Sequence, residues 1–247
     1  MKKFAVFAEG QTEQIFVREL LLRVLDPAKL SFECLELKAQ TFHVVPYKYV
    51  NPHAEIHFMI IHVHGDEGVL SSVRDREKDL IEKSGYERII AIRDMYSEAY
   101  AKRSPGRIND SVTADFIHSH NAIIQNMTYP AKIRLHFAIM EIEAWFLGMY
   151  NLFSKVDYIL TADHIREQLS IELTITDPQK EYYRPSHQIS RICELCGRTY
   201  SKKRDEVESI CSNMELVDFE NAIENGRCEC FADLYREIGN FREASLS

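Results

Sequence analysis

Short apolar runs alternate with amphipathic stretches over the first 150 residues, and this alternation constrains the fold more than any other feature. The apolar runs cover residues 4–8, 57–63, 88–93 and 133–140, and residues 31–37 alternate loosely, as a further strand would. Continuous apolar runs of this length are typical of strands buried on both faces. Strands that alternate with helices form right-handed β-α-β units. We therefore expect an α/β fold with a mostly parallel, Rossmann-like sheet flanked by helices.

The stretches between these runs have helical periodicity. In the first, Phe16, Leu20 and Val24 share one face, Thr12 is the expected N-cap, and Pro27 lies beyond the expected end. Further helices are expected over residues 69–83, ending at Gly85, and 109–126.

The pattern changes after about residue 150, where the segments become polar and helical. The sequence has no internal repeat and no low-complexity tract. We expect an α/β domain over residues 1–150 and a mainly helical region over residues 151–247 that packs on it.

Composition limits the class of protein. Acidic residues outnumber basic ones by 38 to 30 and the pI is near 5.7, so a nucleic-acid site must be local. No apolar run reaches the roughly 18–20 residues of a membrane span. The apolar run at residues 4–8 is too short for a signal peptide, and six cysteines are too sparse for a disulfide scaffold. We expect a soluble cytoplasmic protein without membrane partners and with reduced cysteines.

Acidic residues follow three of the apolar runs: Glu9, with Gly10 after it, then Asp94 and Glu141. The carboxyl ends of parallel strands meet at one edge of a sheet, where ligands bind. Carboxylates there can hold Mg²⁺ or Mn²⁺ for phosphate chemistry. The alternative is that each acid only ends a strand. On a strand Glu141 and Glu143 would share a face, but on a helix they lie about 200° apart. Because we expect the strand to end at Met140, only one of the two should point to the site. We favour Glu141 and keep Glu143 as a further metal ligand.

Several segments resemble known motifs. Glu9-Gly-Gln-Thr-Glu13, opening a helix after the first strand, resembles the first motif of the Toprim fold. The wider pattern resembles a Toprim-like bacterial family, the domain of unknown function numbered 4276. The segments that carry this resemblance are EGQTEQIFVRELL, IIAIRDMYS, EIEAWFL, DPQK, YSKKRD and the pair Cys230-Phe231.

The resemblance implies a Toprim-like fold and, by analogy, a metal-dependent nuclease with Glu9, Asp94 and Glu141 as catalytic and metal-binding residues. It also implies nucleic acid as a partner and, for this broad class, an ATPase partner in bacterial anti-phage defence. Gly10 and Glu13 are supporting candidates, although the helix dipole alone explains an acid at Glu13.

The sequence departs from the Toprim pattern at one position. Tyr96 stands where the second Asp of an Asp-x-Asp motif is expected, and Glu98 is a candidate to compensate. Loss of that carboxylate leaves a second hypothesis open, a catalytically degenerate Toprim-like binding or regulatory module. The single tryptophan, Trp145, is interpreted as a core residue.

Histidines and cysteines offer other metal ligands. His62 and His64 share a face at a strand end near Asp66, which suits a transition metal or a general base; His64 is the better candidate. A small-molecule phosphotransfer or hydrolase site using His64 and Asp94 is a third hypothesis.

The late cysteines allow a structural zinc site. Its four ligands would be Cys193, Cys196, Cys228 and Cys230, in the less usual arrangement CxxC and CxC. The alternative is that Cys193 and Cys196 are buried on a helix with neighbouring isoleucines.

One stretch of this acidic chain is basic. Residues 179–204 carry seven basic residues against two acidic ones, interleaved with three tyrosines. Such a stretch suits a phosphate backbone, although a solvated helical face is the alternative. The nucleic-acid-binding candidates are Lys180, Arg184, Arg198, Lys202, Lys203 and Arg204.

Overall fold

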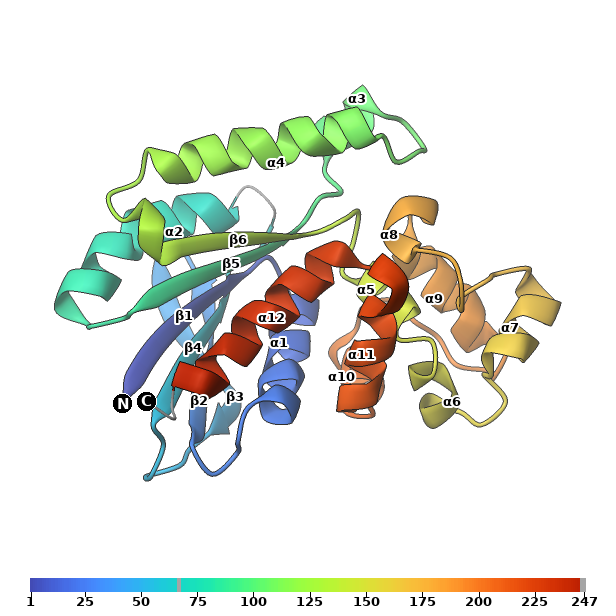
Figure 1. The fold of residues 1–247 in the computed structure, drawn as a ribbon, viewed down its shortest axis with the longest axis horizontal. Coiled ribbons are helices and arrows are strands. Elements are labelled where there is room, and N and C mark those ends of the chain that lie inside the picture. Colours follow the sequence, from blue (N-terminus) through green and yellow to red (C-terminus); the bar gives the residue numbers. More distant parts are fainter. Residues whose placement is uncertain (66–67, 245–247) are drawn as a thin grey trace. The chain divides into compact units, whose positions relative to one another are not determined.

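The computed structural model describes residues 1–65 and 68–244 and has a mixed α/β fold (Figure 1). A six-stranded, mostly parallel sheet is flanked by helices, and the C-terminal part of the chain is helical, as the sequence predicts. The strands are β1 (Lys2–Ala8), β2 (Leu30–Lys38), β3 (Thr41–Tyr49), β4 (Ile56–His62), β5 (Arg88–Asp94) and β6 (Ile133–Ala138). Among the described residues, no helix is long and apolar enough to cross a membrane.

The helices occupy the stretches between and after these strands. They are α1 (Gln11–Val24), α2 (Gly68–Lys78), α3 (Glu98–Arg103), α4 (Asp110–Gln125), α5 (Glu143–Gly148), α6 (Leu152–Val156), α7 (Ala162–Leu169), α8 (Pro178–Glu181), α9 (Pro185–Glu194), α10 (Arg204–Cys211), α11 (Leu216–Ile223) and α12 (Glu229–Ala244). A π-helical turn over Asp79–Lys83 continues α2 to the predicted end.

The strand order across the sheet is β3-β2-β4-β1-β5-β6. The pairs β2–β4, β4–β1 and β1–β5 are parallel, and β2–β3 is antiparallel. In this register His62 pairs with both Ala8 and Glu36, so these three residues lie side by side at the carboxyl ends of their strands.

The edge strand β3 was missed by the sequence analysis. Its residues are mostly exposed and include Pro46, so it has neither a buried apolar run nor a regular alternation. Proline and exposed polar residues are typical of edge strands, which explains why this segment does not read as a strand.

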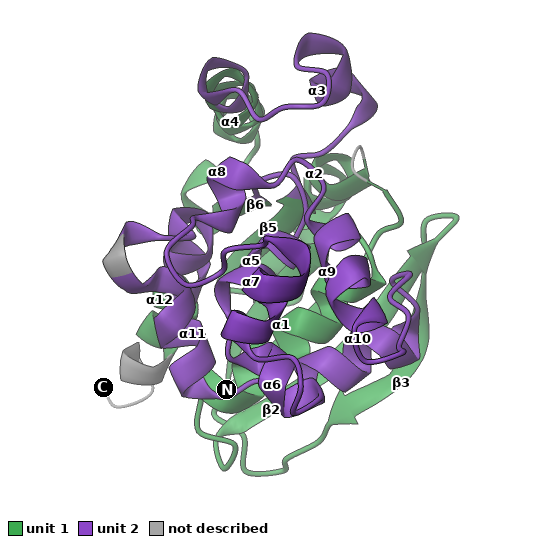
Figure 2. Ribbon diagram, turned by 90° about the vertical axis from the view of Figure 1, so that its right-hand side faces the viewer, with its two compact units in different colours: residues 1–93, 114–137, 236–247 green, residues 94–113, 138–235 purple. Residues whose placement is uncertain are grey.

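The chain divides into two compact units that interleave in sequence (Figure 2). Unit 1 comprises residues 1–93, 114–137 and 236–247, and unit 2 comprises residues 94–113 and 138–235. The expected boundary near residue 150 does not coincide with these divisions. A shift in composition along the chain cannot locate them, because the chain passes between the units four times.

Unit 1 packs helices on the sheet. One face has an apolar core in which Phe7 and Ile61 lie with Val73 of α2 and Ile124 of α4. On the other face, Phe4 contacts Phe241 of α12 at 4.1 Å between ring centroids. Alternate residues of β1 fill these two cores, so this strand is apolar from Phe4 to Ala8.

Unit 2 is built around α5, whose six residues are all buried. Helices α8, α9 and α11 contact it. Trp145 is fully buried and lies 5.4 Å from the ring of Phe231, which confirms it as a core residue. A Cβ on Gly148 would lie 2.8 Å from the sulfur of Cys228, so close packing requires glycine there.

Candidate functional site

The strand-end acid of β5 is fixed by the backbone at the start of α5. Asp94 is 8% exposed, and its Oδ1 accepts a hydrogen bond from the Ile142 backbone N–H at 2.8 Å. An anion is stabilised by the free N–H groups at a helix start. Asp94, the last residue of β5 and the first of unit 2, therefore holds a buried carboxylate at the start of α5.

Two further carboxylates of unit 2 meet at one lysine. The Lys202 ammonium donates to Glu141 Oε1 at 3.1 Å and to Glu143 Oε2 at 3.0 Å. The Tyr200 hydroxyl donates to Glu143 Oε1 at 2.7 Å, and the Ser186 N–H donates to Glu141 Oε2 at 2.9 Å. The fully buried Glu143 is thus satisfied by two donors, as a buried carboxylate must be.

The structure brings both glutamates to one point, whereas the sequence argument expected only Glu141. That argument assumed regular backbone, but β6 ends at Ala138 and α5 begins at Glu143. Between them Met140 has a positive φ of 65°. A non-glycine residue rarely adopts this conformation, so no sequence rule could have placed the irregular turn.

Burial and neighbouring charges act in opposite directions on the pKa values of Glu143 and Lys202. Complete burial raises the pKa of Glu143, and the Lys202 ammonium opposes that shift. Burial lowers the pKa of Lys202, but Glu143, Asp94 and Glu141 together raise it well above its usual value. Lys202 therefore stays charged among three carboxyl groups, and we define these four residues as the acid–lysine cluster.

Tyr96 takes part in a separate contact of unit 2. The Arg184 guanidinium donates to the Tyr96 hydroxyl at 2.6 Å and lies over its ring at 4.9 Å. Tyr183 packs edge-on against the same ring. A tyrosine–arginine pair thus stands at the position where the sequence analysis looked for a second acid.

The other candidates of unit 2 lie on its surface. Glu98 is 84% exposed and forms an ion pair with Lys102, while Lys180 lies 3.6 Å from Asp177. Arg198 and Lys203 are exposed. Arg204 lies 3.5 Å from Glu208 on the same helix.

The proposed zinc ligands are placed differently from the sequence hypothesis. All six cysteines are free thiols, and Cys193 and Cys228 are buried. Burial raises the pKa of Cys193 to about 12. Within residues 1–65 and 68–244, no cysteine belongs to a group of three ligand atoms within 4.8 Å of one another. Cys193 instead lies among buried isoleucines of α9, as the alternative reading expected.

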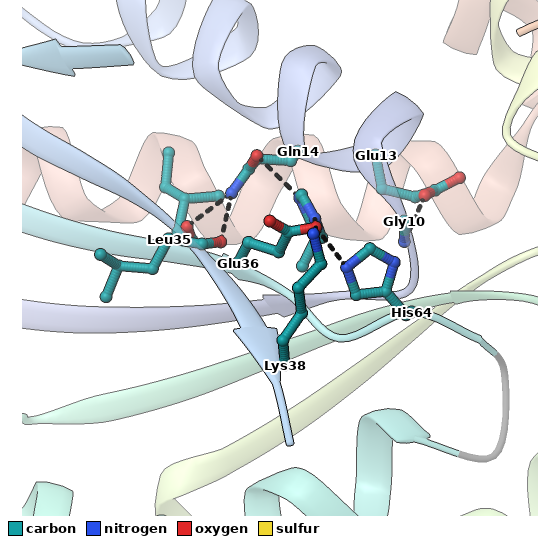
Figure 3. Close-up of polar contacts among 9 residues, drawn as sticks. Gly10, Glu13, Gln14, Leu35, Glu36, Lys38 and His64 are labelled. Carbon is teal, nitrogen blue, oxygen red and sulfur yellow. Dashed lines mark hydrogen bonds and ion pairs between the residues drawn. The ribbon is translucent and has the colours of Figure 1, made fainter. Parts of the chain in front are cut away.

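In unit 1, Glu9 and Gly10 connect β1 to α1. The backbone N–H of Glu9 donates to Ile92, and its carbonyl accepts from Gly65. Gly10, not Thr12, is the N-cap of α1; its N–H donates to the Glu13 carboxylate at 2.8 Å (Figure 3). Glu13 is 4% exposed, so capping the helix accounts for its position.

A second polar group of unit 1 lies at the ends of β2 and β4 (Figure 3). Glu36 Oε1 lies 3.3 Å from His62 Nε2 and 2.6 Å from His64 Nε2. Within the described residues, these are the three side chains whose ligand atoms all lie within 4.8 Å of one another. The sequence analysis identified both histidines but missed Glu36, and Asp66 lies outside the described residues.

The charges of this group differ from residue to residue. A hydrogen bond from Lys38 lowers the pKa of Glu36 to about 2, with smaller contributions from the two histidines, although burial opposes the shift. Burial lowers the pKa of His62, and Glu36 opposes that shift. The group therefore combines an ionised carboxylate with a buried imidazole that favours its neutral form.

Comparison with known proteins gives structural likenesses only. No family model and no curated protein matches the chain. Two solved structures of the C-terminal region of the Xanthomonas campestris pv. campestris OLD protein are similar to it, phased with mercury and with platinum. The first is 12% identical, with 100% of this chain and 99% of that chain covered and a TM-score of 0.40. The second is also 12% identical, with 96% and 97% covered and a TM-score of 0.36.

Proposed function

We propose that the chain is a Toprim-like, Mg²⁺- or Mn²⁺-dependent nuclease in which Asp94, Glu141 and Glu143 are metal ligands. The observation that supports this most is the acid–lysine cluster itself. Asp94, at the end of β5, and the distant Glu141 and Glu143, at the start of α5, converge around the Lys202 ammonium. Carboxylate oxygens are the ligands that Mg²⁺ and Mn²⁺ prefer.

The charges of the cluster fit a divalent cation. One ammonium leaves three ionised carboxylates with an excess of negative charge, which a cation of charge two balances. In the described structure Lys202 lies between Glu141 and Glu143. A divalent cation must therefore compete with this ammonium for their oxygens. A bound metal would act as a Lewis acid and stabilise negative charge on a phosphodiester.

The chain's own residues have separable roles in this proposal. Tyr200 and the Ser186 N–H hold Glu143 and Glu141 in position. Lys202, when released from the carboxylates, is the cation that pairs with a substrate phosphate. Arg184, Arg198 and Lys203 offer further positive charge for nucleic acid. An ATPase partner and a role in anti-phage defence are supported by the family resemblance alone.

Cleavage assays on the full chain test the proposal. Single- and double-stranded DNA and RNA are incubated with Mg²⁺ or Mn²⁺, and Asp94→Asn, Glu141→Gln and Glu143→Gln are compared with wild type. We expect each to lower cleavage at least 100-fold with the fold intact by thermal unfolding. Glu220→Gln, an exposed acid on α11, is the matched control. Full activity in all three variants would refute the assignment, and Glu9→Gln tests the remaining predicted acid.

A second candidate function is nucleic-acid or protein binding without turnover on the same scaffold. The Tyr96–Arg184 pair favours this hypothesis. Tyr96 stands where a second metal-binding acid is expected, and its hydroxyl binds the Arg184 guanidinium. This hypothesis predicts binding that persists in EDTA and weakens in Arg184→Ala. Metal-dependent cleavage abolished by Asp94→Asn would exclude it.

A further inference from the structure

Glu36 and His62 are direct neighbours in the sheet and share a face. The two residues are register partners on the parallel strands β2 and β4. Gln14 of α1 contacts the ring of His62, so this face is the one that α1 covers. The third member, His64, follows two residues after His62 and has a positive φ of 55°. That turn brings the His64 ring to Glu36. It also places the ring edge-on to that of His62, with 4.7 Å between the two imidazole centroids.

Hydrogen-bond accounting fixes which nitrogen of His62 faces Glu36. The Gln14 amide nitrogen donates both of its hydrogens, to the carbonyls of Leu35 and Ile60, each at 2.8 Å. The Gln14 oxygen must then be the acceptor opposite His62 Nδ1, at 3.0 Å, so Nδ1 carries the proton. In a neutral ring, Nε2 is therefore an acceptor, and it lies 3.3 Å from a carboxylate oxygen.

Two acceptors facing each other at that distance require a cation or a proton between them. A metal-binding histidine characteristically donates its other ring N–H to an oxygen that sets its tautomer and orientation. Gln14 plays this part for His62. It is itself held by two backbone carbonyls, so the ligand nitrogen is positioned before any ion arrives.

We propose that Glu36, His62 and His64 form a binding site for a divalent transition-metal ion of the Zn²⁺ class. Imidazole nitrogens select zinc, cobalt or nickel over magnesium. Ligand atoms around a tetrahedral zinc ion lie about 3.4 Å from one another. The distance from Glu36 Oε1 to His62 Nε2, 3.3 Å, is near this value, and the distance to His64 Nε2, 2.6 Å, is shorter. All three ligand atoms lie within 4.8 Å of one another, so they are already gathered around one point.

Three protein ligands leave a coordination position open. The side chain of His64 is 49% exposed, so the group is accessible to solvent. Three ligands with one free position characterise zinc sites that bind water or substrate, whereas structural sites use four. The site uses residues of unit 1 only and does not depend on the proposed nuclease chemistry of the acid–lysine cluster.

Lys38 is the natural competitor of the metal. Its ammonium lies 2.7 Å from Glu36 Oε1, the same oxygen that contacts both histidines. The Lys38 side chain is 57% exposed and can move away into solvent. A metal ion therefore exchanges with this ammonium, and removing the ammonium strengthens metal binding. If Glu36, His62 and His64 formed only a network of ion pairs, removing the Lys38 ammonium would create no affinity for metal.

Metal titration of the tag-free, EDTA-treated full chain tests the site. Co²⁺ is followed by its visible absorption and Zn²⁺ by competition with bound Co²⁺. We compare wild type with Glu36→Gln and His64→Asn. His62 is left unchanged because replacing this buried side chain could unfold the protein. His57→Asn is the matched control, a histidine near the opposite end of the same strand. Asp94→Asn separates this site from the acid–lysine cluster.

We expect one Co²⁺ per chain, displaced by Zn²⁺, with affinity reduced at least tenfold in Glu36→Gln and in His64→Asn. His57→Asn and Asp94→Asn should bind as wild type does, and Lys38→Met should bind more tightly. Absence of a Co²⁺ spectrum in wild type, or equal affinity in wild type and His64→Asn, would overturn the proposal. Loss of the spectrum in Asp94→Asn alone would assign the metal to the other site instead.

Discussion

Replacing Lys202 by methionine tests the acid–lysine cluster without assuming any substrate. The change removes the ammonium that contacts Glu141 and Glu143 and keeps a side chain of similar length. Of the donors that the described residues supply to Glu143, which is 0% exposed, the Tyr200 hydroxyl then remains. Removing one partner of a buried ion pair leaves an uncompensated charge, which is strongly destabilising.

The expected loss of unfolding free energy in Lys202→Met follows from the burial of the ion pair. Breaking a fully buried pair costs about 3–5 kcal/mol. Because the Lys202 side chain is 36% exposed, solvent screening reduces this, and we expect about 2–3 kcal/mol. For a chain of this size that corresponds to a lowering of the melting temperature by roughly 4–12 °C.

The pH dependence has a definite sign. Burial raises the pKa of Glu143 above its ordinary 4.5, and loss of Lys202 raises it further. A carboxyl group whose pKa is raised in the folded state destabilises the fold increasingly as the pH rises from the unfolded pKa to the folded one, and it costs nothing below the unfolded pKa. The deficit of Lys202→Met should therefore be largest at pH 7 and shrink as the pH falls toward 4.5.

Urea unfolding of Lys202→Met and Lys203→Met at pH 7 and pH 5 measures this difference. Lys203 is the next residue and is exposed, so its replacement controls for the loss of one positive charge. Equal stability of the two variants at pH 7, or a deficit that does not change with pH, would refute the electrostatic account of the cluster.

Two further predictions concern stability alone. Glu237→Gln removes a carboxylate that contacts His136 and Arg88. Burial raises the pKa of Glu237, but these two partners lower it by more, so the net pKa is below 4.5. The stabilisation by this carboxylate is therefore present above the unfolded pKa of 4.5 and is lost as the pH falls through the lowered folded pKa. We expect a loss of about 1.5–3 kcal/mol at pH 7 and a flatter decline in acid, by urea unfolding. Gly148→Ala forces a Cβ to 2.8 Å from Cys228 and should cost about 1–3 kcal/mol, partly restored by Cys228→Ala. No restoration in the double variant would show that the strain arises elsewhere.

Buried strands and long helices could be predicted because their signals are local. The runs at β1, β2, β4, β5 and β6 were all identified, and α4 begins after the predicted Asn109, whose side chain accepts from Val112. The edge strand β3 was missed because its stabilisation comes from backbone pairing with β2 and not from an apolar pattern of its own.

The candidate sites also contain features that local sequence signals predict and features that long-range packing determines. The strand-end position of Asp94 and the histidine pair followed from strand periodicity. The meeting of Glu141 with Glu143 depends on the positive φ of Met140, and the part played by Glu36 depends on its register with His62. Neither backbone strain nor strand register can be read from one sequence, because both are set by packing between distant segments.

The most direct test of the central claim is a Mn²⁺ thermal-unfolding titration in the His64→Asn background, which weakens the histidine group. A ligand that binds only the native state raises stability by mass action, about 2.7 kcal/mol at a concentration 100 times its Kd. The account predicts that the midpoint of His64→Asn still rises with Mn²⁺ and that the rise disappears in His64→Asn with Asp94→Asn. An equal rise in both variants, or none in either, would contradict metal binding by the acid–lysine cluster.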